Sequence, residues 1–375
     1  MKPSLHLSVK FGLLICLFVL CNMGCGLFSD DKPDEPRDQF DRAVMLTDWA
    51  DILIIPNYTN YLSKLESLNS AKDQFSTVQD NGSFNSFRSA YLDAYEAWQY
   101  VSMYEIGMAE QIGLRNYTNI YPTDVEGILS NINTPSVELS LPSNFDAQGF
   151  PALDYLLYGS ADSDEAIISY LLESGPQSYV DRLITRLVQL TTEVLDDWQG
   201  GYRTTFIEND ESSATASVDK LVNDYLFYYE KFLRAGKVAI PAGVFTGSEL
   251  PGLVEAPYSR IYSKELLSAG LDATIKFFNG ESLDGQSTGI SIADYLDHNT
   301  EAISSIFVSH TINDQWEVIR DQLASVENDL YSQVENDNSQ MLSLYDEMQK
   351  NVVSLKVDMM MALNIQVDFV DADGD

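Results

Sequence analysis

The stretch YLDAYEAWQYVSMYEIGM, residues 91–108, decides the fold class of this chain. Its large apolar and aromatic residues recur at spacings of three and four, at Tyr91, Ala94, Tyr95, Trp98, Val101, Tyr104 and Met108. The polar residues Asp93, Glu96 and Gln99 fall mostly on the opposite face. This is the period of an α-helix with one buried side, so the stretch predicts an amphipathic helix.

The same helical period recurs along most of the chain. It is strong at residues 183–198, 316–334 and 342–363 and weaker at residues 43–68, 218–237 and 263–278. Within the 43–68 segment we expect a kink or break at Pro56, because proline cannot donate a helical hydrogen bond. Strand signals are scarce by comparison.

Proline, glycine, asparagine and serine cluster in long connections at residues 121–150, 240–257 and 279–288. Long helices joined in this way predict an all-α fold of the up-and-down bundle type. The order of the segments predicts two helical halves, approximately residues 40–205 and 218–375. The short polar stretch 209–217 would join them.

The first 24 residues have the features of a secretory signal peptide. Two lysines flank a short basic region, and residues 11–20 form an apolar run too short to span a bilayer. Gly24 precedes Cys25, which indicates cleavage before the cysteine and attachment of lipid to Cys25. Cys21 is the alternative lipidated residue, since an apolar stretch also precedes it. An ordinary signal peptide cut nearby is the simpler alternative.

Residues 25–39 are polar and contain prolines, so they predict a flexible tether rather than part of a core. The tether would join the lipid to a single large region, residues 40–375. The acidic residues soon after Cys25 resemble the surface-export signal of some Gram-negative lipoproteins. We therefore expect an outer-membrane lipoprotein of the cell envelope, either periplasmic or surface-exposed.

Charge and cysteine content exclude several kinds of function. Without the two lysines of the leader, 20 of the 22 Lys and Arg residues remain against 57 Asp and Glu, a formal charge of −37. Such a surface repels nucleic acid, so no nucleic-acid partner is expected. Cys16, Cys21 and Cys25 all lie in the signal region. If Cys25 is acylated, disulfides, thiolate metal sites and cysteine nucleophiles are excluded from the mature chain.

The segment GFPALDYLLYG, residues 149–159, is the most distinctive candidate for chemistry. Gly149 opens it, Pro151 falls near the expected first turn of a helix, and Asp154 follows three residues later. An aromatic and leucine-rich run then predicts a buried helix face. From the residues alone, a helix start with a well-placed acid explains the pattern.

This segment resembles the signature of the imelysin family, also called M75 peptidase-like proteins. In that signature Gly-x-His-x-x-Glu precedes an aromatic run that ends near a glycine. Gly149 matches the glycine, Asp154 takes the place of the glutamate, and Pro151 stands where the histidine would be. Further segments agree with the family in their order along the chain, at residues 50–58, 94–98, 255–263, and 355–359 followed by 371–375. In the third of these, Tyr258 replaces a histidine and Ser259 follows.

The resemblance covers most of residues 40–375 and implies two helical bundles packed side by side. It also implies a secreted or lipid-anchored protein linked to iron uptake, with a proposed metal-binding His and Glu and an assigned peptidase role. This chain departs at the decisive position, because proline has no donor atom for a metal. Apart from the leader, His298 and His310 are its histidines, and they form no two-histidine helix motif. A Gly-x-Ser-x-Gly elbow is also missing from the sequence.

Carboxylates and tyrosines remain as candidate ligands, and oxygen ligands suit hard cations such as Ca²⁺ or ferric iron. Our hypothesis is that Asp154 and Glu255 face one groove between the bundles, with Tyr258 and Tyr155 nearby, and bind iron or calcium there. The alternative is that Asp154 caps a helix and Glu255 lies on the surface. Other carboxylates in or near the long connections are Glu105, Asp124 and Glu126.

Three functions stay open from the sequence. The first is a non-catalytic binding lipoprotein of imelysin type, which serves iron or haem acquisition together with an uptake partner protein. The second is a metallopeptidase, as the family resemblance implies, and the third is a structural surface protein that docks a partner. Rate enhancement needs positioned acid, base or metal groups. Since the sequence offers no clear set of these, it favours binding over catalysis.

Overall fold

The structure, a computed structural model, describes residues 40–300 and 308–369, and its regular elements are helices. The β-pairing within these residues is one isolated antiparallel bridge between Glu281 and Thr288. The all-α prediction is therefore confirmed. The predicted signal peptide, the tether, Cys21 and Cys25 lie outside the described residues. The division into halves at about 205 and 218 stays a prediction, since the named helices all belong to one compact unit.

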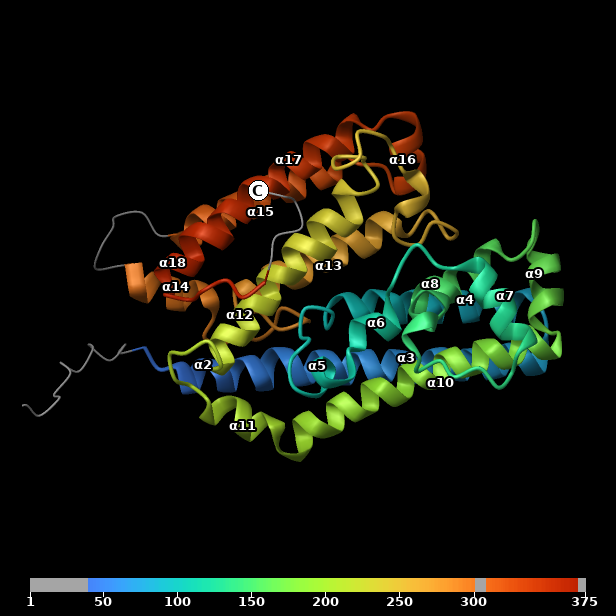
Figure 1. Ribbon diagram of the computed structural model, residues 1–375, viewed down its shortest axis with the longest axis horizontal. Helices are drawn as coiled ribbons and strands as arrows, with labels where there is room; N and C mark the ends of the chain where they lie inside the picture. Colours follow the sequence, from blue (N-terminus) through green and yellow to red (C-terminus); the bar gives the residue numbers. More distant parts are fainter. Residues whose placement is uncertain (1–39, 301–307, 370–375) are drawn as a thin grey trace, which may run out of the picture. The chain divides into compact units, whose positions relative to one another are not determined.

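Figure 1 shows the helices in chain order. Those before residue 209 are α2 (Arg42–Asp48), η1 (Trp49–Ile54), α3 (Ile55–Val78), α4 (Asn81–Gln99), α5 (Met108–Ile112), α6 (Leu114–Thr118), α7 (Val125–Asn133), η2 (Pro142–Ala147), α8 (Gly149–Asp154), η3 (Tyr155–Gly159), α9 (Asp164–Leu171), α10 (Ser174–Asp197), η4 (Trp198–Tyr202) and α11 (Arg203–Glu208). Those after it are α12 (Ser217–Phe227), η5 (Tyr228–Ala239), η6 (Pro251–Leu253), α13 (Ser263–Phe278), α14 (Ile292–Thr300), α15 (Val308–Ala324), α16 (Leu330–Asn336), α17 (Ser339–Val353), η7 (Ser354–Met359) and α18 (Met360–Ala362).

The helix predicted from residues 91–108 exists but has different ends. This helix is α4, and it begins at Asn81. The side chain of Asp80, the residue before it, accepts a hydrogen bond from the Ser83 backbone amide at 2.8 Å and so caps the helix. It ends at Gln99. The backbone then closes turns in which the amide of Val101 bonds to the carbonyl of Trp98, at 3.1 Å, and that of Tyr104 to Val101. Residues 101–104 in these turns are all buried, so apolar residues continue the sequence pattern past the end of the helix.

A second predicted helix, residues 316–334, is in fact two helices. α15 ends at Ala324, and α16 begins at Leu330. The Asp329 side chain accepts a hydrogen bond from the Ser332 backbone amide at 3.1 Å and starts the new helix. Val326 lies between the two helices and is still buried. The helical spacing of apolar residues in the sequence therefore continues across the break, which is why one long helix was predicted.

The helix predicted at residues 43–68 runs without a break through α2, η1 and α3 as far as Val78. Pro56 lies at the start of α3, directly after the wide π-helical turns of η1. The irregularity expected near this proline is therefore present, but as widened turns instead of an interruption. The other four predicted helices are confirmed, at α10, α12 with η5, α13, and α17 with η7 and α18. The predicted connection 121–150 contains α7 and η2.

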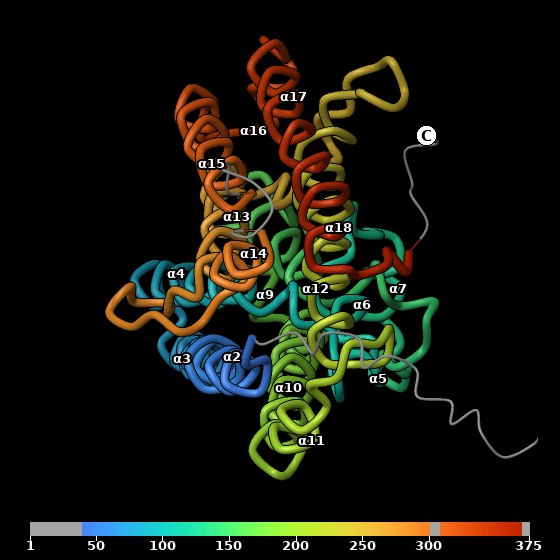
Figure 2. The backbone as a smooth tube through the Cα atoms, turned by 90° about the vertical axis from the view of Figure 1, so that its left-hand side faces the viewer, coloured from blue at the N-terminus to red at the C-terminus, as the bar shows by residue number. Residues whose placement is uncertain are grey.

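Neighbouring helices pack through buried aromatic and aliphatic faces. α3 packs against α4 and α10, α17 packs against α15 and η5, and α13 packs against α4. Figures 1 and 2 show α3 and α10, and likewise α15 and α17, running alongside one another. The ring of Phe277 in α13 lies 5.2 Å from Trp49, 5.5 Å from Tyr104 and 5.4 Å from Tyr225. Burial of such rings is worth about 1.5–3 kcal/mol each, so this cluster holds distant parts of the chain together.

In the part of the chain that the structure describes, no helix has the length and apolar character needed to cross a bilayer.

Candidate functional site around Asp154 and Glu255

The signature segment begins with a backbone turn that needs glycine. Gly149 has φ +72°, in the left-handed region, and a Cβ atom there would lie 2.2 Å from the carbonyl oxygen of Thr118. Pro151 follows in the first turn of α8, where its missing N–H leaves no helical bond unmade. The ring of Phe150 stacks on Tyr95 with centroids 4.5 Å apart. The whole of α8 is buried, so the segment is fixed tightly in the core.

We expect Gly149→Ala to lower the free energy of unfolding by about 3 kcal/mol, because it adds both a left-handed strain and a clash with backbone. Gly247→Ala is the matched control. Gly247 has a similar φ, +70°, but open space around the added Cβ, so it should lose only about 1 kcal/mol. Urea unfolding of both variants followed by tryptophan fluorescence measures the difference. Equal losses would show that the contact with Thr118 is unimportant.

Asp154 is fully buried and binds the backbone of a distant loop. Its carboxylate accepts hydrogen bonds from the backbone amides of Tyr258, at 2.9 Å, and Ser259, at 3.1 Å. The hydroxyl of Tyr91 lies at the limit of hydrogen bonding, 3.5 Å away. Burial raises the pKa of Asp154 to about 6, while these donors oppose the rise. Asp154 stands directly before η3, but its side chain makes no capping hydrogen bond to that helix and binds the distant loop instead, so the alternative that Asp154 caps a helix is wrong.

Glu255 is also buried, with 1 % of its side chain exposed, so the alternative that it lies on the surface is wrong. Its carboxylate accepts hydrogen bonds from the Asn119 amide at 2.8 Å and the Gln99 amide at 3.2 Å. It also forms an ion pair with the ammonium group of Lys237, which is only 3 % exposed. Burial lowers the pKa of Lys237, and the Glu255 carboxylate opposes this. Sequence reasoning missed Lys237, because it stands in an ordinary amphipathic helix.

The structure thus brings Asp154 and Glu255 to the same loop, since Glu255 precedes the amides that Asp154 binds. Both carboxylates raise the pKa of Tyr91, whose burial is the larger cause. Each carboxylate is already bound by groups of the chain itself. Among the described residues, no three His, Cys, Asp or Glu side chains come together in a way that could hold a metal. Binding of iron or calcium by Asp154 and Glu255 stays a prediction.

The two tyrosines predicted to lie near this site do pack together. The rings of Tyr155 and Tyr258 meet edge to face with centroids 5.2 Å apart. The Tyr258 ring also lies against Gly159, where a Cβ would come within 2.2 Å of it. Ser259 is buried, and its hydroxyl lies 3.5 Å from the carbonyl oxygen of Ala256. Tyr258 and Ser259 therefore contribute two backbone donors and a packed ring, which no side-chain pattern in the sequence could indicate.

The other candidate carboxylates lie apart from this loop. Asp124 precedes α7 and Glu126 is an exposed residue in its first turn. Glu105 is half-buried beside Arg115, with 3.2 Å between its carboxylate and the guanidinium, and its backbone amide donates to Asp224 at 2.6 Å. Burial raises the pKa of Glu105 to about 7, Arg115 lowers it, and the neighbouring acids Asp224 and Glu110 raise it.

This raised pKa predicts a dependence of stability on pH. Folded protein binds the Glu105 proton more tightly than unfolded protein, whose pKa is near 4.5. The favourable contribution is therefore complete below pH 4.5 and is lost as the pH rises through 7. Between pH 5 and 8, wild type should lose about 2 kcal/mol more stability than Glu105→Gln. Urea unfolding at several pH values tests this, and parallel curves for the two proteins would contradict it.

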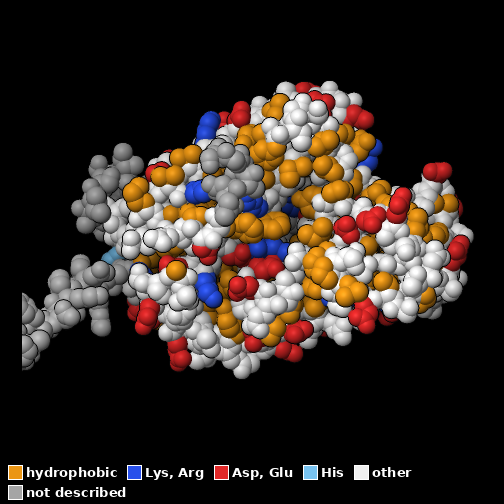
Figure 3. Space-filling model, viewed as in Figure 1, with side chains coloured by type: hydrophobic (Ala, Val, Ile, Leu, Met, Phe, Trp, Pro, Cys, Tyr) orange, Lys and Arg blue, Asp and Glu red, His pale blue; other side chains and the backbone are white. Residues whose placement is uncertain are grey.

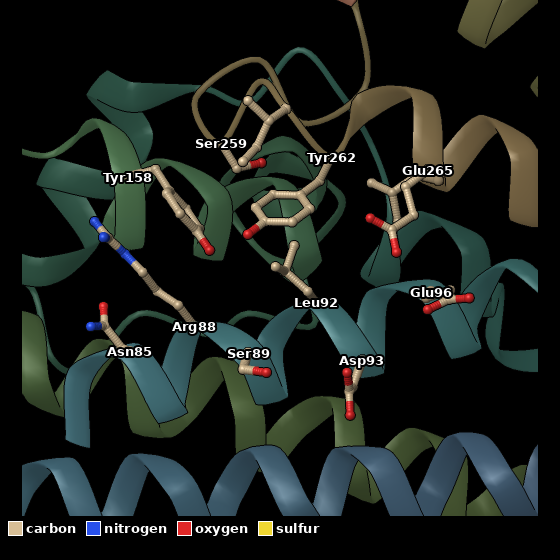
Figure 4. Close-up of a pocket in the computed structure, with 12 residues that line it drawn as sticks. Asn85, Arg88, Ser89, Leu92, Asp93, Glu96, Tyr158, Ser259, Tyr262 and Glu265 are labelled. Atoms are coloured by element: carbon tan, nitrogen blue, oxygen red, sulfur yellow. The ribbon is translucent and has the colours of Figure 1, made fainter. Parts of the chain in front are cut away.

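A solvent-accessible groove lies beside the Asp154 loop. It consists of two adjoining hollows, each of about 640 Å³, between α4 on one side and α13 with the preceding loop on the other, and α15 also lines the second hollow. Both hollows share Glu96, Ile261 and Glu265, and the first is also lined by Ser259. Figure 4 shows Tyr158 and Tyr262 above α4, and Glu96 and Glu265 near one another across the groove. The sequence did not predict this groove, because Glu265 looks like any acid on an exposed helix face.

Comparisons with known proteins agree with this architecture. The family model Peptidase_M75, described as Imelysin, matches residues 54–356. The fold is similar to the crystal structure of an imelysin-like protein from Psychrobacter arcticum 273-4, with 20% sequence identity and a TM-score of 0.68, over 88% of this chain and 97% of that one. It is also similar to a proposed iron-regulated protein A precursor from Parabacteroides distasonis ATCC 8503, with 13% identity and a TM-score of 0.68, over 86% and 95% of the two chains. A search of curated proteins finds no match.

These features define a class of all-helical proteins with a buried Gly-x-x-x-x-Asp segment. The aspartate of this segment is hydrogen-bonded to a loop more than 100 residues away in the sequence. The match to the family model covers most of the chain. The chain belongs to the imelysin family.

Proposed function

We propose that this protein is a membrane-anchored envelope lipoprotein of imelysin type that binds its ligand without catalysis and serves iron or haem acquisition. The observation that carries the proposal is the state of the signature residues. Pro151 offers no ligand atom, Asp154 is bound by two backbone amides, and Glu255 is paired with Lys237. Asp154 and Glu255 are thus engaged in contacts that stabilise the fold. A non-catalytic binding role does not require them to leave these contacts, whereas catalysis by them would.

The alternative is a metallopeptidase, as the name of the family model suggests. Hydrolysis of a peptide bond requires a general base or a metal-activated water next to the substrate. Asp154 and Glu255 would take either role only after giving up their present hydrogen bonds and ion pair. Because both are buried, that exchange would cost several kcal/mol. This cost favours binding over peptidase activity.

Two observations support the link to iron. One structurally similar protein is described as iron-regulated, and the mature chain has a formal charge of −37, which attracts cations. On the face shown in Figure 3, acidic side chains are spread along the surface and basic ones are few. Iron is the first candidate for a bound metal and calcium the second, since carboxylate and tyrosine oxygens suit both.

The test compares metal content and peptidase activity in the purified mature protein. We expect iron or haem to bind, as measured by elemental analysis and visible absorption, and casein to remain uncut by both wild type and Pro151→His. Cleavage of casein by wild type would replace the proposal with the peptidase. Failure to bind iron, haem or calcium would replace it with the third function, a structural protein that docks a partner.

Anchoring is tested separately by substitution of the two candidate cysteines. Cys25→Ser should abolish incorporation of labelled palmitate and release the protein from the outer-membrane fraction. Cys21→Ser should leave both unchanged. The reverse result would move the lipid to Cys21, and absence of label from the wild type would contradict a lipoprotein. Protease treatment of intact cells then distinguishes the periplasmic from the surface-exposed side.

A further inference from the structure

The groove beside the Asp154 loop has, on each of two walls, a carboxylate without a direct partner in the described part of the chain. Glu96 stands on α4 and Glu265 on α13, and both line each of the two hollows. Within the described residues neither carboxylate has a hydrogen bond or an ion pair, whereas their neighbour Asp93 is paired with Lys64 at 3.1 Å. The pKa of Glu96 is raised, first by partial burial and then by the charges of Glu265 and Asp93, while the charge of Lys64 opposes the rise. A cation placed between the walls would relieve this repulsion.

The basic side chains that line the groove are engaged elsewhere. Arg88 donates to the carbonyl of Leu157 at 2.6 Å and pairs with Asp164 at 2.9 Å. Lys264 donates to the carbonyl of Val326, and Arg320 pairs with Asp272 at 3.0 Å. These contacts give each of the three basic side chains a partner other than Glu96 and Glu265. The chain therefore does not use them to neutralise Glu96 and Glu265.

The groove also offers apolar and aromatic surface beside the carboxylates. The rings of Tyr158 and Tyr262 lie 6.4 Å apart in the first hollow. Ile261 is 59 % exposed and belongs to the lining of both hollows. Lysine and arginine side chains combine an apolar stem with a charged end, and their charge is attracted to aromatic faces. Carboxylates, tyrosine rings and an exposed isoleucine in one groove match such side chains better than they match a free metal ion.

We propose that the groove between α4 and α13 binds a segment of a partner protein that carries lysine or arginine side chains. The proposal rests on the binding role inferred above and specifies the partner's chemistry. The cationic ends lie between Glu96 and Glu265, and the apolar stems pack on Ile261 and the tyrosine pair. The groove touches the Asp154 loop directly, because Ser259 lines it. The buried carboxylate thereby holds one wall in position for the partner.

The test is binding of a short fluorescein-labelled peptide of alternating lysine and alanine, measured by anisotropy on the full mature chain. Glu96→Gln with Glu265→Gln should weaken binding about tenfold, since each ion pair with an exposed group is worth up to about 1 kcal/mol. The matched control is Glu66→Gln with Glu335→Gln, which removes the same charge from exposed positions outside the groove. The control should change affinity less than twofold. Ile261→Ser, which leaves the charge unchanged, should also weaken binding.

Three results would overturn the proposal. They are failure of wild type to bind the lysine peptide, equal weakening by the two double variants, and equal binding of the same peptide with glutamate in place of lysine. Equal weakening would mean attraction by the overall negative charge of the protein. Iron and haem binding, measured as above on the same samples, distinguishes the two proposals. If the Glu96 and Glu265 double variant no longer binds the peptide but still binds iron or haem, the result supports peptide binding in the groove. If the wild type binds neither iron nor haem, the result contradicts only the proposed function.

Discussion

Asp154→Ala is expected to lower the free energy of unfolding by about 3 kcal/mol at neutral pH. The substitution leaves the backbone amides of Tyr258 and Ser259 buried without an acceptor, and each such group costs about 1–3 kcal/mol. Loss of a buried charge offsets part of this cost. Asp162→Ala is the control, since Asp162 is exposed, and it should change stability by less than about 0.5 kcal/mol. Urea unfolding followed by tryptophan fluorescence measures both.

The effect of Asp154→Ala should also depend on pH in a defined direction. The folded-state pKa of Asp154 is about 6, above the ordinary value of 3.8, so folded protein holds this proton more tightly. Its favourable contribution is complete below pH 3.8 and is lost as the pH rises through 6. The difference between wild type and variant should therefore be about 1 kcal/mol larger at pH 5 than at pH 7. A smaller difference at pH 5 would show that the carboxylate is held in its charged form.

Lys237→Met should have an effect of similar or larger size, about 4 kcal/mol, because it leaves Glu255 buried without its cation. The amides of Asn119 and Gln99 remain as donors but carry no net charge. The double variant Lys237→Met with Glu255→Gln removes both charges and keeps an oxygen that can accept from these amides. It should recover most of the lost stability, since a buried ion pair is often replaceable by neutral groups. Additive losses in the double variant would show that the two side chains act independently.

The helices could be predicted because each buries one face, and a buried face leaves a period in the sequence. Their ends could not, because burial continues through turns. Val101 and Tyr104 are as buried as the helical residues before them, yet they lie beyond the end of α4. Val326 similarly hides the break between α15 and α16. The starts of α4 and α16 are marked by the caps Asp80 and Asp329, each of which pairs with a serine three residues later.

The site residues were found through the family resemblance, but their contacts were not. Asp154 and Glu255 bind groups that lie far away in the sequence or belong to the backbone, and neither kind of partner leaves a motif. Lys237 illustrates the difficulty, because a lysine in an amphipathic helix predicts a solvated side chain, whereas here it is buried against Glu255. The groove could not be predicted from the sequence either. Glu96 and Glu265 belong to two separate helices, and only the fold shows that they line the same hollows.

The hydrogen bonds from Asn119 to Glu255 and from Tyr258 to Asp154 each join residues that lie before and after the exposed stretch 210–215 in the sequence. A protease that cleaves this stretch would break the chain but leave these two hydrogen bonds in place. The two fragments should therefore elute together in gel filtration until denaturant separates them. During synthesis the N-terminal part of the chain is made first, so the Asp154 carboxylate reaches the backbone amides of Tyr258 and Ser259 only after residue 259 has been made.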